Sequence, residues 1–430
     1  MKHLFPWAIR LLVLLLLAGV THSALATDTD MGNLRLSGYG TLGYVGDNHK
    51  EIATMRDVSQ TLSEGYKTGN SWKVDSRLGL QVDYRFSPTV EAVAQAVLRD
   101  QVVKTLDTTM ELAYVGVATA PDWTVRLGRL GLDVFLMSDH RNLGYAYNWV
   151  RPPQEYYSWL PVFSLDGLDV TYKTTMNNAN WRIKAQLGQS EPSIAMGASS
   201  YQAEVDKLFI LSAQREAGPW RLKAGYAFLH VNNEVGALAL LHTELDKVAG
   251  LNLPQISAEA ASLRANAGFY DASKHFLSFG AAYDDGEWLG QAEVGMSKTD
   301  TAALNASRLA YVVLGRRVGN FTPFALLATS RPNISLVTPI NDWGRVSPAS
   351  ALALRGLQNS AVYVANSTRM DQESLSLGVR WDFHDQAAFK LQWSSSHIHQ
   401  QGYGIWARAP HINDQDSRVN SLSASLDFVF

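Results

Sequence analysis

The feature that most constrains the fold is the last stretch of the chain, Arg418 to Phe430, which reads RVNSLSASLDFVF. From Leu422 onward an apolar residue occupies every second position, with serines and Asp427 between them. A period of two is typical of a β-strand with two different faces. The alternation runs to the final residue, without the frayed polar end that a soluble domain usually has. We therefore predict a terminal strand that closes a β-barrel in lipid.

The same pattern recurs along the chain, most clearly between Lys73 and Phe86, where nearly every second residue is charged or able to hydrogen-bond. Turning such a face toward lipid would cost roughly 2–4 kcal/mol for each basic residue near the membrane midplane. The charged face must therefore point into the lumen, because a one-residue slip would expose all of it. This phase predicts a set of charged pore-wall residues: Lys73, Arg77, Glu111, Arg126, Lys184, Lys223 and Arg380.

The connections between the predicted strands alternate between long and short. Short turns are predicted at Ser87, Ala120, Asn177, Gly218, Asp285, Gly319 and Asp385. The count comes to about sixteen antiparallel strands, an even number of the kind found in bacterial single-chain barrels, which place short turns on the periplasmic side. The sequence thus predicts an all-β transmembrane barrel over residues 27–430, with no linker that divides it.

The first residues have the pattern of a secretory signal peptide. Lys2 and Arg10 supply positive charge, an apolar run follows, and Ala24-Leu25-Ala26 forms a small-x-small cleavage site. The apolar run is shorter than the roughly 20 residues of a membrane-spanning helix. We predict cleavage after Ala26, so that residues 1–26 are absent from the mature protein.

The composition excludes several classes of function. The formal net charge is −3, so nothing indicates a nucleic-acid partner, and the absence of cysteine excludes disulfides and thiolate metal sites. The segment from Gly38 to Gly43 matches the dinucleotide fingerprint G-x-G-x-x-G, but its glycines lie inside an alternating strand and no helix opens after them. We expect no cofactor.

The terminal strand, the stretch SWKVDSRLGLQVDYRF and the loop after the fifth predicted strand together resemble the Gram-negative outer-membrane general porins, which are trimers of sixteen-stranded barrels. The resemblance spans residues 27–430. It implies an outer-membrane location among lipid and lipopolysaccharide, a homotrimer, and delivery by the barrel assembly machinery through the strand that ends at Phe430. It also implies a water-filled channel for passive diffusion of small hydrophilic solutes and ions.

The resemblance further implies that the third external loop folds into the lumen and narrows it. That loop reads GLDVFLMSDHRNLGYAYNWVRPPQEYYSWLPVFSLD. Its candidate constriction residues combine charges with amphipathic rings: Asp133, Asp139, Arg141, Arg151, Glu155, Tyr145, Tyr147 and Trp149. In the family, basic wall residues oppose acidic loop residues. Here Lys73 and Arg77 would form the basic side, and Asp133, Asp139 and Glu155 the acidic side.

Glu111 departs from the basic wall, and the loop carries arginines of its own. Basic residues modestly outnumber acidic ones at the inward positions, which predicts a weak preference for anions.

Other functions are also open. The aromatic residues of the third loop could line a binding site for sugars or small organic acids in a substrate-specific channel. A barrel-type enzyme is a minor alternative. It would need adjacent catalytic groups, whereas Ser212 and His230, both predicted to face outward, lie too far apart in height to touch. Because His397, His399 and His411 have no carboxylate at a fixed spacing, we interpret them as solvated loop histidines and predict no metal site.

Overall fold

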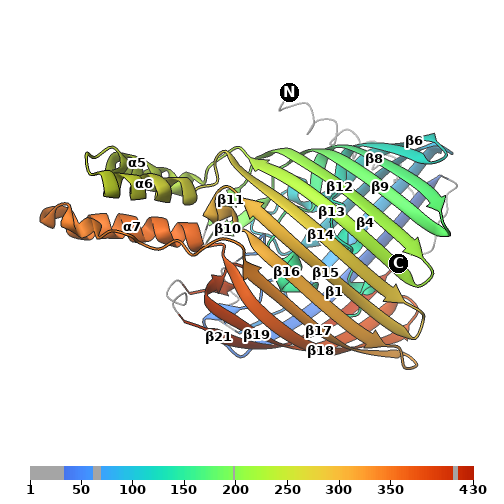
Figure 1. The fold of residues 1–430 in the computed structure, drawn as a ribbon. Coiled ribbons are helices and arrows are strands. Elements are labelled where there is room, and N and C mark those ends of the chain that lie inside the picture. The colour runs from blue at the N-terminus through green and yellow to red at the C-terminus, as the bar shows by residue number, and fades with distance from the viewer. Residues whose placement is uncertain (1–32, 62–68, 197–198, 410–414) are drawn as a thin grey trace.

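The computed structural model describes residues 33–61, 69–196, 199–409 and 415–430. Over these residues, seventeen strands form one antiparallel sheet, and sixteen long strands remain when the two-residue strand β3 is left out. The first long strand pairs with the last, so the sheet is closed into a barrel (Figure 1). This confirms the predicted all-β transmembrane barrel. The predicted signal peptide, residues 1–26, lies outside the described residues.

The long strands, in chain order, are β1 (Leu34–Asp47), β4 (Arg77–Ser87), β5 (Val90–Arg99), β6 (Met110–Ala120), β7 (Trp123–Gly131), β8 (Ser164–Met176), β9 (Ala179–Ser190), β12 (Val205–Ala217), β13 (Trp220–Val231), β14 (Ala272–Asp284), β15 (Trp288–Thr299), β16 (Ser307–Arg316), β17 (Phe321–Pro332), β18 (Met370–His384), β19 (Ala387–Tyr403) and β21 (Ser417–Val429). The short strands are β2 (Ile52–Ala53), β3 (Asn70–Ser71), β10 (Ser193–Met196), β11 (Ser199–Gln202) and β20 (Ala407–Arg408). The helices are α3 (Leu106–Thr109), α4 (Gln154–Tyr157), α5 (Ala239–Ala249), α6 (Pro254–Asn266) and α7 (Ala351–Asn366), with 3-10 turns η1 (Ser138–His140), η2 (Gly144–Ala146), η3 (Gly236–Leu238), η4 (Ala302–Leu304), η5 (Trp343–Arg345) and η6 (Pro348–Ser350).

The seam between β1 and β21 closes the barrel, and it depends on two glycines. Gly38 and Gly40 face outward, and the rings of Phe430 and Phe428 lie directly over them, leaving no room for a Cβ atom. Gly38 and Phe430 also exchange two backbone hydrogen bonds of 2.9 Å. The aromatic end of the chain is therefore held flat against the first strand. These glycines are not open to a neighbouring protomer.

The two faces of most strands follow the predicted phase. Leucines on the outward face of the early strands are largely exposed, as at Leu36 (58%) and Leu98 (58%). The prediction is wrong for β16, where Leu309, Tyr311 and Val313 are buried inside the barrel, while the alternate residues face outward. Both faces of β16 and β17 are apolar, so polarity alone could not assign their phase.

The two ends of the barrel differ. One end, here called the turn end, holds the seven short connections, and the outward Trp123, Trp220, Trp288 and Phe321 directly follow four of them. These rings suit the membrane interface, where amphipathic aromatic side chains gather. The opposite end, the loop end, carries the long connections, including α5, α6 and α7, which project away from the barrel (Figure 1).

Helices α5, α6 and α7 pack on one another through a small apolar core that includes Leu245, Leu263 and the fully buried Trp343. None of the helices in the described part of the chain is long and apolar enough to cross a membrane. The three-helix cluster is thus built from two loops of the loop end.

Glu259 of α6 is the polar centre of this cluster. Its carboxylate accepts hydrogen bonds from the backbone of Ile340 and Asn341, and from the side chains of Trp343 and Gln358, at 2.7–3.1 Å. Burial alone would raise the pKa of Glu259, but these donors hold that pKa below its usual range. The cluster therefore depends on an ionised Glu259.

We expect acid to loosen this cluster. A carboxyl group with a lowered folded-state pKa contributes stability above its unfolded value of about 4.3, and this contribution is lost as the pH falls through the folded value. The chain lacks cysteine, so spin labels can be placed at Leu240 and Leu352, both largely exposed. Their distance distribution should broaden at pH 3 and stay narrow at pH 7.

The variant Glu259→Gln should broaden the same distribution at pH 7, because an amide NH2 group would face donors, at a cost of about 1–3 kcal/mol. The exposed control Glu244→Gln should not. An unchanged distribution in Glu259→Gln would contradict this role for the carboxylate.

Candidate functional site

The third long loop (residues 132–163) lies inside the barrel. Its residues hydrogen-bond to inward side chains of strands on all sides, including β4, β6, β9, β15, β18, β19 and β21. Its 3-10 turn η2 contacts both β1 and β21, and its short helix α4 contacts β16, β17 and β18. The loop therefore crosses the lumen.

One anchor of the loop is a buried ion cluster at its start. The carboxylate of Asp133 is almost fully buried (1% exposed) and pairs with Lys223 and, at 2.8 Å, with Lys184. The Asp133 backbone N–H also donates to Gln186 at 2.9 Å. Two lysines share one carboxylate here, so Asp133 offsets part of the positive charge on the inner face of β9 and β13.

A second anchor lies across the barrel on β19. The Lys390 ammonium group is fully buried and donates to the carbonyl oxygens of Gly144 (2.6 Å) and Trp149 (3.1 Å). It also lies 3.0 Å from the carboxylate of Asp427, which accepts a 2.5 Å hydrogen bond from Thr41. This anchor joins the loop to β19, β21 and β1.

A third anchor uses arginines. Arg77 of β4 donates to the Asn142 carbonyl (2.5 Å) and to the Tyr147 hydroxyl (2.6 Å). Arg151 of the loop forms a two-contact ion pair with Asp75 at 3.0 and 2.5 Å. Arg151 also donates to Ser423 of β21 at 3.0 Å, so these arginines fix the loop to the wall near the seam.

The loop covers an apolar half of the inner wall. Phe135, Tyr156 and Tyr157 pack against Phe276 and Tyr311 from β14 and β16, with ring centroids 5.3–6.4 Å apart. The inward residues of β12 to β17 in the same buried cluster are Leu208, Ile210, Phe276, Leu309, Tyr311, Val313, Phe324, Leu326 and Ala328. This seal displaces water from one side of the lumen, and the space that remains lies toward β4 to β9.

That space is a cavity of 1090 Å³ between the loop and the strands β4 to β9. Its lining reaches from Arg35, Gln386 and Phe430 at the turn end to Glu111 and Phe163 near the loop end. A second cavity of 70 Å³ begins where the first one ends, because both are lined by Glu111, Val162 and Phe163. The two cavities lie one after the other along the barrel, away from its centre, and together they are here called the route.

Phe163 lies where the two cavities meet, and this place is here called the narrow point because the second cavity is much the smaller. The guanidinium groups of Arg99 and Arg141 lie over the two sides of its ring, 3.7 and 4.0 Å from the centroid. Arg99 Nε lies 3.4 Å from the Glu111 carboxylate, which also accepts a 2.6 Å hydrogen bond from Asn142. Two cations, one carboxylate and one ring therefore bound the narrow point.

A β-bulge brings Glu111 to this place. The pairing of β5 with β6 shifts between Gln95 and Ala96, so that Gln95 opposes Leu112 and Ala96 opposes Met110. Leu112 and Tyr114 consequently line the cavity together with Glu111, although strict alternation predicted them on the lipid side. A bulge inserts one unpaired residue and re-aims its neighbours, and no residue type in β6 announces it.

The structure separates the predicted site residues into two groups. Those that line the large cavity are Asp139, Arg141, Glu111, Arg126 and Lys184. Those held in the packing of the loop against the wall are Asp133, Arg151, Glu155, Tyr147, Trp149, Arg77, Lys223 and Arg380. Tyr145 donates to the carbonyl of Asp385 at the turn end. Lys73 was predicted on a wall strand, but β4 begins at Arg77 and Lys73 lies exposed in the preceding loop.

Two of the charged residues that line the large cavity form ion pairs with neighbouring side chains. Arg126 pairs with the buried Asp169 at 3.1 Å, and Asp139 pairs with Arg182 at 3.0 Å. His140 of the loop also lines the large cavity. The charged groups that line the large cavity are four cations and two carboxylates: Arg35, Arg126, Arg141, Lys184, Glu111 and Asp139.

Several residues of the route and its anchors were missed by the sequence reasoning. Phe163, Arg99 and Lys390 had no pattern that set them apart, because a ring between two guanidinium groups joins residues distant in the chain. The inward phase of Lys390 and Asp427 could have been found from the alternation of β19 and β21.

The enzyme alternative used Ser212 as an outward residue, and this phase is wrong. Ser212 is buried on the inward face of β12, whereas His230 lies on the outward face of β13. In the register, Ser212 opposes Gly225, five residues from His230. The two side chains lie on opposite sides of the barrel wall and cannot act together.

Comparison with known proteins supports the fold. The scan against protein-family models finds no match, and the search of curated protein sequences finds none either. Solved structures match over nearly the whole chain. OmpF of Salmonella typhi matches with a TM-score of 0.52 and 11% identity, over 93% of this chain and 98% of that one.

Two further structures match at a TM-score of 0.50 and 11% identity. An anion-selective porin from Comamonas acidovorans covers 92% of this chain and 99% of its own. The outer-membrane channel DcaP of Acinetobacter baumannii covers 94% and 100%. The chain therefore has the sixteen-stranded fold of outer-membrane porins.

Proposed function

We propose that the protein is an outer-membrane channel for passive diffusion of small hydrophilic solutes and ions, with a weak preference for anions. The observation that carries this proposal is the charged route between the third long loop and the strands β4 to β9. A sixteen-stranded barrel encloses more space than side chains alone fill, and here the loop fills only one side of it.

The anion preference follows from the charges that line the large cavity, where four cations face two carboxylates. A charged lining in a low-dielectric wall concentrates ions of the opposite sign. In a planar bilayer under a salt gradient, the purified refolded protein should conduct and give a reversal potential on the anion side. Absence of conductance would refute the channel, and a strongly cation-selective potential would refute the preference.

Glu111→Gln should shift the reversal potential further toward anions. This change removes one of the two cavity carboxylates, at the narrow point, while the amide oxygen can still accept from Asn142. The matched control is Glu287→Gln at the turn end, whose carboxylate pairs with Arg316 outside the route. Equal potentials for Glu111→Gln and the unchanged protein would exclude Glu111 from the ion path.

The narrow point at Phe163 favours a second candidate, a channel selective for small organic anions. Arg99 and Arg141 beside the ring offer charge, and the second cavity holds only 70 Å³. The loop aromatics Tyr147 and Trp149 are buried and do not supply such a site. Saturable, solute-dependent blocking of single-channel current by small carboxylates would favour this candidate over general diffusion.

The proposal includes the biological setting that the fold implies. The chain would lose residues 1–26 on export, reach the outer membrane through the assembly machinery by way of its Phe430 strand, and contact lipid and lipopolysaccharide. The outward Ala94 and Ala96 of β5 are small and partly exposed, which suits a close contact between protomers of a homotrimer, whereas Ala92 is buried. Cross-linking in mild detergent tests this, and a protein that remains monomeric would contradict the trimer.

A further inference from the structure

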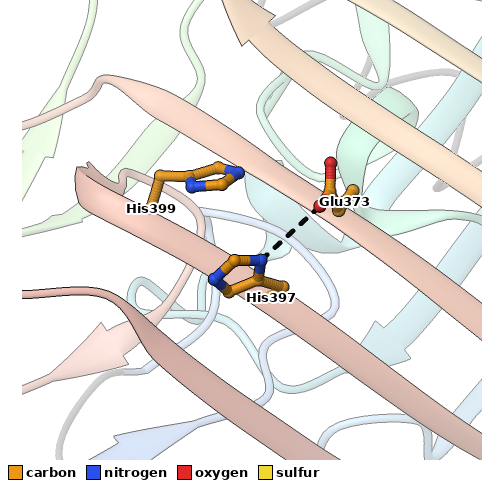
Figure 2. A group of neighbouring side chains, drawn as sticks. All are labelled: Glu373, His397 and His399. Carbon is orange, nitrogen blue, oxygen red and sulfur yellow. Dashed lines mark ion pairs between the residues drawn. The ribbon is translucent and has the colours of Figure 1, made fainter.

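Two histidines and a glutamate gather on the outer face of the barrel at the loop end (Figure 2). Glu373 lies on β18, and His397 and His399 lie on β19. In the register Glu373 directly opposes His397, and His399 is two residues further along on the same face. The next outward residue of β18 after Glu373 is Leu375, which is 38% exposed and belongs to the apolar band. The group therefore lies at the edge of that band. The site is thus separate from the proposed ion route.

We propose that Glu373, His397 and His399 form a binding site for a divalent transition-metal ion such as Zn²⁺. One ligand atom from each residue can be chosen so that all three lie within 4.8 Å of one another. Ligands about 2.1 Å from a tetrahedral ion lie about 3.4 Å apart, and His397 Nδ1 already lies 3.5 Å from Glu373 Oε1. Small side-chain rotations of His399 complete the triangle and leave a fourth position for water.

In each histidine ring, one nitrogen atom can bind a metal ion while the other lies near the carboxylate of Asp416. His397 Nδ1 faces Glu373, while its Nε2 lies 3.5 Å from Asp416. His399 Nδ1 lies 3.6 Å from the same carboxylate oxygen of Asp416, and His399 Nε2 is buried without a hydrogen bond to any described residue. We therefore assign Nδ1 of His397 and Nε2 of His399 as ligands. Asp416 is a positioning residue, because a carboxylate on the far nitrogen orients a metal-binding imidazole.

The chemistry of the donors selects the ion. Imidazole nitrogen suits Zn²⁺, Cu²⁺ and Ni²⁺, whereas Ca²⁺ and Mg²⁺ prefer sites made of oxygen. A competing cation is Arg331 of β17, which pairs with Glu373, and a second cation, Arg418 of β21, opposes His397 in the register. A carboxylate has two oxygens, and Arg331 contacts Oε2 while His397 faces Oε1. Both contacts can therefore exist with the ion bound. The sequence prediction of solvated histidines missed Glu373 and Asp416, and His411 lies outside the described residues.

Metal binding is tested with the full chain, refolded without a histidine tag. Titration calorimetry with ZnCl2 should show one site, and Co²⁺ should give a visible absorption band of a nitrogen-ligated ion. The variants His397→Ala and His399→Ala should each abolish this site. His275→Ala removes an outward histidine of β14, which bonds to Tyr226 far along the sheet, and should leave binding unchanged.

Glu373→Gln and Asp416→Asn test the two carboxylates with little change in shape. Asp416→Asn should weaken Zn²⁺ binding about 10- to 100-fold, the usual effect of losing a carboxylate behind a ligating histidine. The proposal is overturned if the unchanged protein binds no Zn²⁺, if His397→Ala and His399→Ala bind as well as it does, or if His275→Ala loses the site equally. Ion conductance in bilayers should be the same with and without Zn²⁺, which keeps this test independent of the channel proposal.

Discussion

Replacing Asp133 by alanine is expected to destabilise the barrel by about 3–5 kcal/mol, the usual cost of leaving a buried charge without its partner. Asp133 is the counter-ion of two lysines, Lys184 and Lys223, and all three residues are at most 5% exposed. Without the carboxylate the two ammonium groups repel each other, and the start of the third long loop loses its attachment. The temperature at which the folded band disappears on gels should fall, and so should the midpoint of thermal unfolding.

The same variant should also change the channel. Lys184 lines the large cavity, so removing its counter-ion should move the reversal potential toward anions. For stability the matched control is Asp139→Ala, because Asp139 belongs to the same loop but its carboxylate is 54% exposed and its pair with Arg182 is worth less in water. Equal stability of the Asp133 and Asp139 variants would show that the buried cluster does not hold the loop.

Lys390→Met is expected to have a comparable effect at the opposite wall. Methionine keeps the length of the side chain but removes the donor to Gly144 and Trp149, and it leaves the fully buried Asp427 without its ion-pair partner. We expect a loss of about 3–5 kcal/mol in the free energy of unfolding. Single-channel traces should become noisier, because the middle of the loop keeps only weaker contacts to β19, such as the hydrogen bond from Val150 to Gln392.

A double variant separates charge from packing at this site. Adding Asp427→Asn to Lys390→Met removes the uncompensated carboxylate and should recover part of the lost stability, a coupling that a mutant cycle measures. Lys298→Met, on an exposed lysine of β15, should be close to neutral. If the double variant is no more stable than Lys390→Met alone, the ion pair with Asp427 is not what stabilises the anchor.

The strands could be predicted because lipid and water impose opposite demands on adjacent residues. In β4 every second side chain is polar, so the phase of Arg77 followed directly from the sequence. In β16 both faces are apolar, since Tyr311 and Val313 pack under the third loop rather than facing water. In β16 the expectation that inward residues are polar therefore fails, and an interpretation based on polarity assigns the wrong face to the lumen.

The candidate site was predictable in its location but not in its roles. The sequence identified Asp133 and Arg151 as charges of the third long loop, but their burial depends on Lys223 and Asp75, which are far away in the chain. The bulge that exposes Glu111 and Leu112 together to the lumen has no residue signature. The division of charges between anchors and lining is therefore a property of tertiary packing.

The 3-10 turn η2 lies against the seam, and Gly144 within it touches Thr41 of the first strand and Asp427 of the last. The surface that η2 contacts is formed jointly by the first and the last strand, so it exists only when the two ends of the chain are paired. The contact surface for the third long loop is therefore complete only in the closed barrel, so an unclosed barrel could not hold the loop in its final position. Closure of the barrel and the shape of its lumen are thus linked, because the loop that restricts the lumen rests on the seam.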